Sequence, residues 1–330
     1  MRSRIPVPGD PSSAKGEASG SFGRMTRDIR LCLPCPDPRP GKIWGDWFFA
    51  QSLARALERA GRGVRIATAK RRSGGFWMRA VPQRWLWQDE IDLVIRGGKA
   101  WPKLGRRPLF IWLISRPDTL TDREIREAEH IFVASELYMA ELERRGARAV
   151  SFLPQCTDPG LFSPDRAEKA LASEILFVGN RRKSFPRAVV ERALATGRSL
   201  SVWGRGWHDA LPPGTLRGVE IQNAELGRHY ASAGVVLNDH HPDMLAHGFV
   251  SNRVYDVLAS GRPVLTEDMP GLPGDLRPAV FAYSDGTFAE LLGTALEDDR
   301  QDRKEIATHV RSSHGFDNRA RSILEVMGHA

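Results

Sequence analysis

The sequence has no long hydrophobic run. No stretch approaches about 18 uninterrupted apolar residues, so no transmembrane helix is expected. The N-terminus also lacks the apolar core of a signal peptide, because residues 1–24 are rich in Gly, Ser, Pro and charged residues. This composition predicts a disordered N-terminal extension, with Met25 as a candidate start. We therefore expect a cytoplasmic protein.

Cysteine is scarce as well. Three Cys in 330 residues are too few for a disulfide framework. Cys32 and Cys35 form a C-x-x-C sequence, which fits a redox or zinc site or two incidental thiols at the end of a strand. Zinc would need a second pair, and Pro34, Pro36 and Pro38 crowd the place where a redox helix would begin. The pattern favours incidental thiols.

Acidic residues are outnumbered in one half of the chain only. Residues 25–155 carry 24 Lys+Arg against 15 Asp+Glu, a balance of +9, whereas residues 156–330 carry 20 against 23, a balance of −3. A basic half could contact nucleic acid, an anionic membrane or a phosphorylated acceptor. No RRM, KH or paired zinc ligands are visible. We expect no nucleic-acid partner, and a basic nucleic-acid-binding protein is kept as an alternative.

The first half of the chain alternates short apolar strands with helices. A helix is expected from about Trp47 to Ala60, where Gly61 ends it, and Thr121 and Glu124 form a capping box that opens another. A further helix is expected over Ser135–Arg145. The expected strands are Asp28–Leu33, Val64–Ala67, Ile91–Ile95, Leu109–Ile114, Ile131–Val133 and Ala149–Leu153.

A second series of the same kind follows a stretch rich in Pro and Gly. The expected strands are Ile175–Val178, Leu200–Val202, Val235–Leu237 and Pro263–Thr266. The expected helices are Pro186–Thr196, Glu225–Ala233, Asn252–Ala259, Thr287–Leu296, Arg303–Arg311 and Asn318–Met327. Such alternation predicts doubly wound parallel sheets.

The domain boundaries follow from this pattern. We expect the extension over 1–24, a Rossmann-like domain for the acceptor over 25–155, a linker over 156–172 and a donor-binding domain over 173–330. The last helix is expected to pack back on the first domain. Two sheets joined by one linker place a cleft between the domains, which is a usual site for a small molecule.

A basic turn follows the first strand of the second series. Gly179 permits a tight turn, Arg181, Arg182 and Lys183 follow, and Pro186 suits the start of a helix. Free N–H groups at a helix start, together with three cations, make an anion site suited to a diphosphate. A solvated basic loop is the alternative.

A polar run follows the strand that ends at Leu237 and leads into a helix. Polar groups at this place line the crevice of an open α/β sheet. A metal site is a weaker interpretation, because the side chains of neighbouring residues point in different directions. No second group of possible metal ligands is visible elsewhere in the sequence. The residues that suggest it are Asp239, His240, His241, Asp243 and His247.

From Ser173 onward the sequence resembles the C-terminal domain of GT-B glycosyltransferases, especially the CgeB-like, spore-coat-type branch of the group 1 transferases. The matching pieces lie at 175–180, 202–207, 237–240 and, most specifically, 248–265. Upstream, the pieces at 112–118, 132–136 and 153–159 are similar to the same branch. The resemblance implies a GT-B fold with two Rossmann-like domains facing a cleft.

The resemblance also implies roles for individual residues. Arg181, Arg182 and Lys183 would bind the donor diphosphate, Asp256 would hold the donor ribose, and Arg253 is a further candidate for the diphosphate. The donor-binding residues are Asn180, Arg181, Arg182, Lys183, Gly204, Asn238, Ser251, Asn252, Arg253 and Asp256.

The sequence departs from the E-x7-E pair of related retaining enzymes. Gly248 stands eight residues before Asp256, where such enzymes have Glu. His240, Asp239 or His247 could substitute, and we take His240 as the candidate catalytic residue. Fixed cations can stabilise a diphosphate leaving group without a metal, so we expect a retaining, metal-independent reaction with no cofactor besides the nucleotide sugar.

The first domain is expected to receive the acceptor. Asp46 is a candidate base for an acceptor hydroxyl, and a plain helix N-cap is its alternative role. Residues 70–87 interleave cations with aromatic residues, which fits contact with anionic lipid at the inner face of the membrane or a lipid-linked acceptor. A loop and helix with inward-packed Trp side chains and solvated Arg side chains is the alternative, and the pattern favours it.

The sequence therefore predicts a glycosyltransferase that uses a nucleotide-diphosphate sugar. The acceptor is open, with a cell-surface polysaccharide or a lipid-linked glycan as candidates. A nucleotide-sugar epimerase of the same fold, or a family member that only binds a nucleotide sugar, are the closest alternatives.

Overall fold

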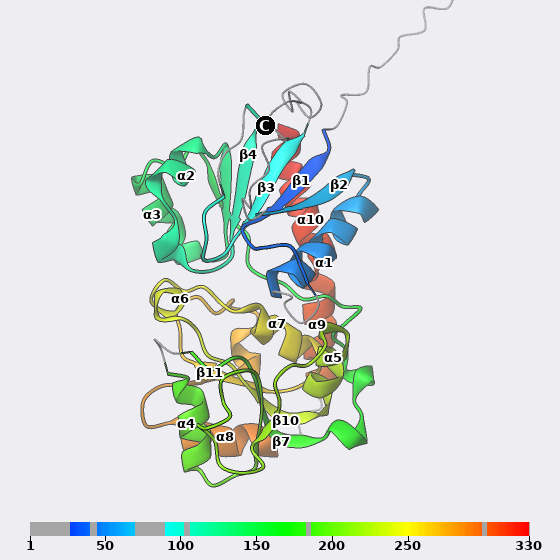
Figure 1. Cartoon of the computed structure of the whole chain (residues 1–330), viewed down its shortest axis with the longest axis vertical. Coiled ribbons are helices and arrows are strands. Elements are labelled where there is room, and N and C mark those ends of the chain that lie inside the picture. Colours follow the sequence, from blue (N-terminus) through cyan, green and yellow to red (C-terminus); the bar gives the residue numbers. More distant parts are fainter. Residues whose placement is uncertain are drawn as a thin grey trace, which may run out of the picture.

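The computed structural model describes residues 27–39, 45–69, 90–101, 106–182, 186–298 and 302–329. The predicted extension over 1–24, the segment 70–87 and Lys183 lie outside these ranges. The described chain forms two domains, one above the other in Figure 1, each built on a six-stranded parallel sheet.

The first sheet has the strand order β2-β1-β3-β4-β5-β6. β1, β3 and β4 are buried along their whole length, as expected for parallel strands covered on both faces. The strands are β1 (Ile29–Leu33), β2 (Val64–Thr68), β3 (Ile91–Arg96), β4 (Leu109–Leu113), β5 (His130–Val133) and β6 (Val150–Phe152).

Helices cover both faces of this sheet. On one face α1 (Gly45–Arg59) packs beside the last helix, α10 (Phe316–His329). On the other face lie α2 (Asp122–Glu127) and α3 (Met139–Arg144). The predicted capping box of α2 is present, because the Thr121 hydroxyl accepts from the backbone N–H of Glu124 and the Glu124 carboxylate accepts from Thr121.

The second sheet has the order β12-β11-β10-β7-β8-β9. The chain builds outward from β7 on one side and then returns to build outward from β10 on the other. This order places a topological switch point between β7 and β10. The strands are β7 (Ser173–Val178), β8 (Leu200–Trp203), β9 (Leu216–Gly218), β10 (Ala233–Leu237), β11 (Val264–Glu267) and β12 (Val280–Tyr283).

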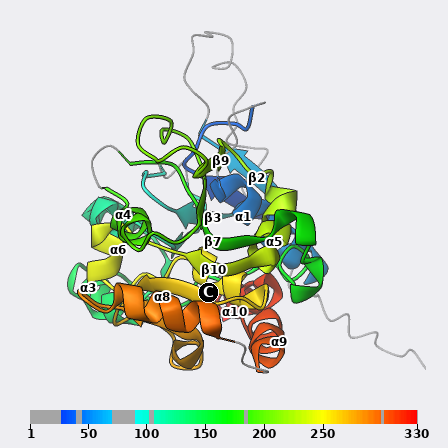
Figure 2. The same cartoon turned by 90° about the horizontal axis from the view of Figure 1, so that it is seen from below.

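Helices cover both faces of the second sheet. On one face are α4 (Ala188–Ala195) and α8 (Phe288–Glu297), and on the other are α5 (Asn223–Ser232), α7 (Asn252–Ala259) and α9 (Arg303–Ser313). In Figure 2, α4 and α8 lie on one side of β7 and β10, and α5 and α9 lie on the other. The short helix α6 (Pro242–Ala246) follows β10 and lies near the first domain.

The chain crosses between the domains twice, and the two crossings lie side by side. Thr157 forms an isolated parallel bridge with Gly315, and its N–H donates to the His314 carbonyl at 2.9 Å. After the second crossing, Phe316 and the buried face of α10 join the core of the first domain. The second domain is therefore tied to the first by both the linker and the C-terminal helix.

The expected strands and helices are confirmed, most of them to within two residues, but within the described ranges two strands and one α-helix are missed. β9, α6 and β12 have no expected counterpart. β9 has three residues and ends in Gly218, too short for an apolar pattern. The helix expected over Ser135–Arg145 begins as a 3₁₀ turn at Glu136–Tyr138 and becomes α-helical only at Met139.

Candidate functional site

The loops after β7 and β10 meet at the switch point of the second sheet. Leu176 of β7 is paired with Val236 of β10, so both strands end at the same edge. Gly204, at the end of β8, packs against the loop after β7 with a φ of 149°. A Cβ there would stand 2.2 Å from the Gly179 carbonyl oxygen. Gly204 is therefore needed for the close approach of these loops.

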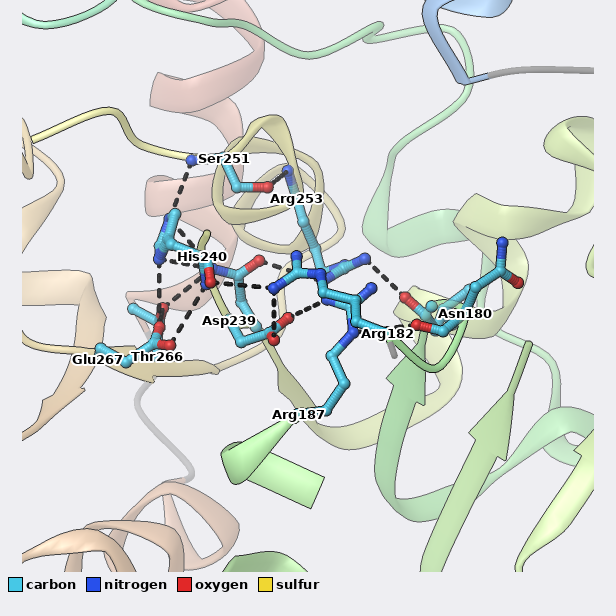
Figure 3. Close-up of polar contacts among 12 residues, drawn as sticks. Asn180, Arg182, Arg187, Asp239, His240, Ser251, Arg253, Thr266 and Glu267 are labelled. Atoms are coloured by element: carbon cyan, nitrogen blue, oxygen red, sulfur yellow. Dashed lines mark hydrogen bonds and ion pairs between the residues drawn. The ribbon is translucent and has the colours of Figure 1, made fainter. Parts of the chain in front are cut away.

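Two arginines from the loop after β7 point at one carboxylate from the loop after β10 (Figure 3). The Arg182 guanidinium donates to the Asp239 carboxylate at 3.3 Å and to the His240 carbonyl at 3.1 Å. Arg187 forms an ion pair with the other oxygen of Asp239. Burial lowers the pKa of Arg182, and it lowers the pKa of Arg187 to about 10 despite the Asp239 charge. Two desolvated cations therefore share one anion.

Arg253 joins the start of α7 to the end of β7. Its guanidinium donates to the Val178 carbonyl at 2.6 Å and to the Asn238 side-chain oxygen at 3.2 Å. Ser251 is the N-cap of α7, since its hydroxyl accepts from the backbone N–H of Arg253. The basic turn after β7 and the start of α7 therefore converge, as the sequence predicts.

His240 is held between the start of α7 and a carboxylate at the end of β11. The backbone N–H of Ser251 donates to His240 Nε2 at 3.1 Å, which makes Nε2 the acceptor. Nδ1 then carries the proton and donates to Glu267 at 3.2 Å (Figure 3). Burial alone would raise the pKa of Glu267, but the hydrogen bond from His240 lowers it. Glu267 therefore orients the neutral ring and can stabilise its protonated form.

Asp256 faces the linker. Thr157 donates to one of its carboxylate oxygens at 2.8 Å and Asn252 donates to the other at 3.1 Å. Burial raises its pKa to about 8, because the side chain is shut off from solvent. Its assignment as the ribose ligand stays a prediction, and in this structure both oxygens already have partners within the protein.

The backbone at Gly248 accounts for the missing Glu. Gly248 has a φ of 70°, and a Cβ there would lie 3.1 Å from both Gly271 Cα and a methyl group of Leu137. A larger residue would be strained in this left-handed conformation and would crowd both neighbours.

The other predicted donor residues differ in exposure. The Arg181 side chain is exposed, and its backbone N–H donates to the Arg205 carbonyl at 2.9 Å. The Asn180 side-chain oxygen accepts from the Arg205 backbone N–H at 2.8 Å. Asn238 is fully buried and donates to Thr266 at 2.9 Å. Asn180 and Asn238 thus support the loops, whereas Arg181 is open to a ligand.

In the first domain, Asp46 lies in the first turn of α1. Gly97 directly follows β3, and a Cβ on it would be 3.7 Å from a carboxylate oxygen of Asp46. Asp46 therefore lies at the switch point of the first sheet, between β1 and β3. Burial raises the pKa of Asp46. A carboxyl group with a raised pKa at the end of the sheet suits a general base, and the role stays a prediction.

The loops of the two domains touch one another. Arg116, three residues after the end of β4, forms an ion pair with Asp243 of α6 at 3.0 Å. The Ser135 hydroxyl donates to the His247 carbonyl at 2.6 Å, and the His247 ring approaches Asp118 at 3.3 Å. Of the predicted crevice residues, Asp243 and His247 therefore contact the first domain.

In the part of the chain that the structure describes, the side chains of the polar run after β10 do not gather into a group of three possible metal ligands. Among the described residues, the one group of three ligands close enough to hold an ion is Asp275, His309 and His314, on α9 and a different loop. Arg319 donates to Nδ1 of His314, so Nε2 carries the proton that it shares with Asp275. That arrangement opposes metal ligation by the ring.

All three Cys are free and buried, and burial raises the pKa of Cys35 to about 11, which fits incidental thiols.

None of the helices that the structure describes combines the length and the apolar character of a membrane-spanning segment.

A cavity of about 280 Å³ lies at the crossing between the domains. Its lining includes Arg55, Arg59, Arg311 and Arg321, and it contains none of the predicted donor residues.

Sequence reasoning missed Arg187, Glu267 and Arg116. Glu267 follows Thr266, where the predicted strand ends, so the same rule that singled out Asp239 would have found it. Arg187 follows Pro186 in the predicted helix. Its pairing with Asp239 joins positions 52 residues apart, which no local pattern shows.

Comparison with known proteins bears on the enzyme class and on the fold. Residues 181–325 match a family described as glycosyl transferase-like, which confirms the predicted enzyme class on the second domain. No curated protein is similar enough in sequence to match.

Solved structures with the same fold include three glycosyltransferases. AviGT4, involved in avilamycin A biosynthesis, is 17% identical with a TM-score of 0.59, over 90% of this chain and 96% of AviGT4. A UDP-forming α,α-trehalose-phosphate synthase from Burkholderia vietnamiensis is 13% identical with a TM-score of 0.59, over 93% and 100%. T4 phage BGT in complex with UDP-glucose is 11% identical with a TM-score of 0.55, over 90% and 98%. The chain therefore has the GT-B fold.

Proposed function

We propose that this protein transfers a glycosyl group from a nucleotide-diphosphate sugar, held at the switch point of the second domain, to an acceptor on the first. The observation that carries the proposal is the convergence of Arg182, Arg187 and Arg253 with the start of α7. Such sites suit anions, because several arginines and the positive end of a helix face the same point. The match of residues 181–325 to a glycosyl transferase-like family supports it.

The chemistry follows from charge. Cleaving the bond between sugar and diphosphate leaves negative charge on the leaving group, and fixed cations stabilise it as it develops. Arg182 and Arg187 are held in place by Asp239, so they need little reorganisation. His240 and Glu267 lie beside this point, where they can bind the sugar or move a proton. Asp46 would accept the proton of the acceptor hydroxyl.

Metal independence is part of the proposal. Three arginines supply the positive charge that a divalent cation would otherwise bring to the diphosphate. We expect transfer activity to survive EDTA. Complete loss with EDTA, restored by added Mg²⁺ or Mn²⁺, would show that the cations of the protein do not suffice.

The donor is identified with a thermal-shift panel of UDP-, GDP-, dTDP- and ADP-sugars. A ligand of the folded state raises the melting temperature, by an amount that reflects its concentration relative to its Kd. The proposal requires at least one clear shift. If none of the panel stabilises the protein at millimolar concentration, donor binding at this site is refuted.

The finer expectations stay proposals with tests of their own. Retention of configuration, and the CgeB-like branch, derive from sequence resemblance, and the anomeric coupling constant of the product by NMR decides between retention and inversion. A lipid-linked acceptor and a peripheral location at the membrane would be supported by sedimentation with anionic liposomes at low salt.

The two alternatives have distinct outcomes. An epimerase would convert the donor sugar without any acceptor, so product analysis with and without acceptor separates it from a transferase. A nucleic-acid-binding protein would bind random DNA with steep salt dependence.

A further inference from the structure

We propose that Arg116 is a donor-binding residue contributed by the first domain: its guanidinium leaves Asp243 and pairs with the diphosphate, so that donor binding draws on both domains. The inference rests on the proposed function and adds a residue that neither the sequence motifs nor the family match assign. Four features of the structure support it.

The backbone of Arg116 is in the left-handed region. With φ 55° and ψ 54°, it is the one residue other than glycine with a positive φ among those that the structure describes. A side chain with a Cβ is disfavoured there, whereas Gly or Asn adopts this conformation readily. Residues kept in such conformations cluster at ligand-binding sites, where the strain serves to direct a side chain. Retaining Arg here therefore indicates a use for its guanidinium.

The ion pair of Arg116 with Asp243 is one of several contacts that join the domains. Ser135 donates to the His247 carbonyl at 2.6 Å, and the rings of Tyr138 and Phe249 lie 5.6 Å apart. Met244 and Phe249, although they follow β10, are buried in a cluster of the first domain. These contacts already hold the α6 region against the first domain. The need to hold the two domains together therefore does not explain the left-handed backbone of Arg116.

Arg116 lies next to the donor site. Asp243 is in the first turn of α6, three residues after His240, whose carbonyl accepts from Arg182. Between them lies His241. Burial, followed by the positive charges of Arg182 and Arg116, lowers its pKa to about 4. The field at this point is therefore positive and comes from both domains.

The Arg116 side chain is more exposed than its partner. It is 35% exposed, whereas the Asp243 side chain is 8% exposed. A diphosphate at the switch point offers more negative charge than one carboxylate and would compete for the guanidinium. Asp243 thus holds Arg116 in the cleft until the donor arrives.

Binding of UDP, GDP, dTDP, ADP and inorganic pyrophosphate is measured by isothermal titration calorimetry at constant salt. The proteins are the wild type, Asp243→Asn, Arg116→Asn/Asp243→Asn and, as a control at the opposite edge of the second sheet, Arg198→Gln. Arg198 is exposed and pairs with Glu174 at the start of β7. The control should bind like the wild type.

We expect Asp243→Asn to bind the best of these ligands at least as tightly as the wild type, because a competing carboxylate is gone. Adding Arg116→Asn should weaken that binding on the order of tenfold, the value of one charge-assisted hydrogen bond. It should leave the melting temperature equal to or above that of Asp243→Asn, because Asn accepts the left-handed backbone without leaving a carboxylate unpaired. Loss of affinity with unchanged or higher stability is the signature of a binding residue.

Each other outcome has one meaning. If Arg116→Asn/Asp243→Asn binds as tightly as Asp243→Asn, Arg116 does not touch the diphosphate and the inference is wrong, while the proposed function stands. If it lowers affinity and melting temperature together, Arg116 is structural and the inference is also wrong. If the wild type binds none of the five ligands, the proposed function itself fails.

Discussion

Replacing Asp256 by Asn should change how the stability of the protein depends on pH. Asp256 is 5% exposed, lies between Thr157 and Asn252, and has a pKa raised to about 8 by burial. In the unfolded chain this carboxyl loses its proton near pH 4, as an ordinary Asp does. The folded state therefore holds a proton that the unfolded state has released, over the whole interval between these values.

The sign and size of the effect follow from this difference. The contribution of a protonated Asp256 is fully present below about pH 4 and is lost as the pH rises toward 8, at about 1.4 kcal/mol per pH unit. Over the full interval the loss is about 5 kcal/mol as an upper bound, and between pH 6 and pH 8 it is about 2 kcal/mol. An Asn side chain has no proton to lose. Its oxygen can accept from Thr157, and its amide group can donate to Asn252 after that side chain flips.

The assay compares melting temperatures of wild type and Asp256→Asn from pH 5 to pH 9. Groups common to both proteins cancel in the difference. The advantage of the variant should grow by about 5 °C between pH 6 and pH 8. Asp285→Asn, at a carboxylate that is 95% exposed, is the matched control and should show a constant difference. A constant difference for Asp256→Asn as well would refute a buried, protonated carboxyl at the linker.

Three further predictions concern the donor site. Arg182→Gln should weaken donor binding in calorimetry by about 10- to 100-fold, which is the value of one or two charge-assisted hydrogen bonds. The control Arg198→Gln should not weaken it, and equal effects of the two substitutions would mean that only the net charge matters. Gly204→Ala should lower the free energy of unfolding by about 3 kcal/mol, because a Cβ would collide with the Gly179 carbonyl and the φ is unfavourable for Ala. An unchanged melting temperature would contradict the close packing of the loops after β7 and β8. Glu267→Gln should lower kcat by about tenfold, with a smaller change in donor KM, because an amide accepts a weaker hydrogen bond from His240 than a carboxylate does. An unchanged kcat would rule out a role for this contact in the reaction.

The fold was predictable because its signals are local and repeated. The helix Asn252–Ala259 has the bounds that the sequence predicts, since Ser251 caps its start and Gly261 adopts a φ of 69° just past its end. β12 was missed although Val280–Tyr283 is apolar, because the strand has only four residues, begins two residues after Pro278 and pairs with β11 alone at the edge of the sheet.

The site was predictable in position but only partly in its contacts. The rule that loops after parallel strands line the crevice placed Arg182, Asp239 and His240 correctly at one edge of the sheet. It could not show that Asp256, one turn after Arg253 on α7, faces the linker. Nor could it show the left-handed backbone of Arg116, because no local sequence pattern favours that conformation for Arg.

A crystal structure of the protein with the nucleoside diphosphate that the panel selects tests the central claim most directly. The account predicts both phosphates at the ends of β7 and β10, within hydrogen-bonding distance of Arg182 or Arg187 and of the first N–H groups of α7. Phosphates bound elsewhere, for example among the arginines of the cavity at the domain crossing, with the switch point empty, would contradict it.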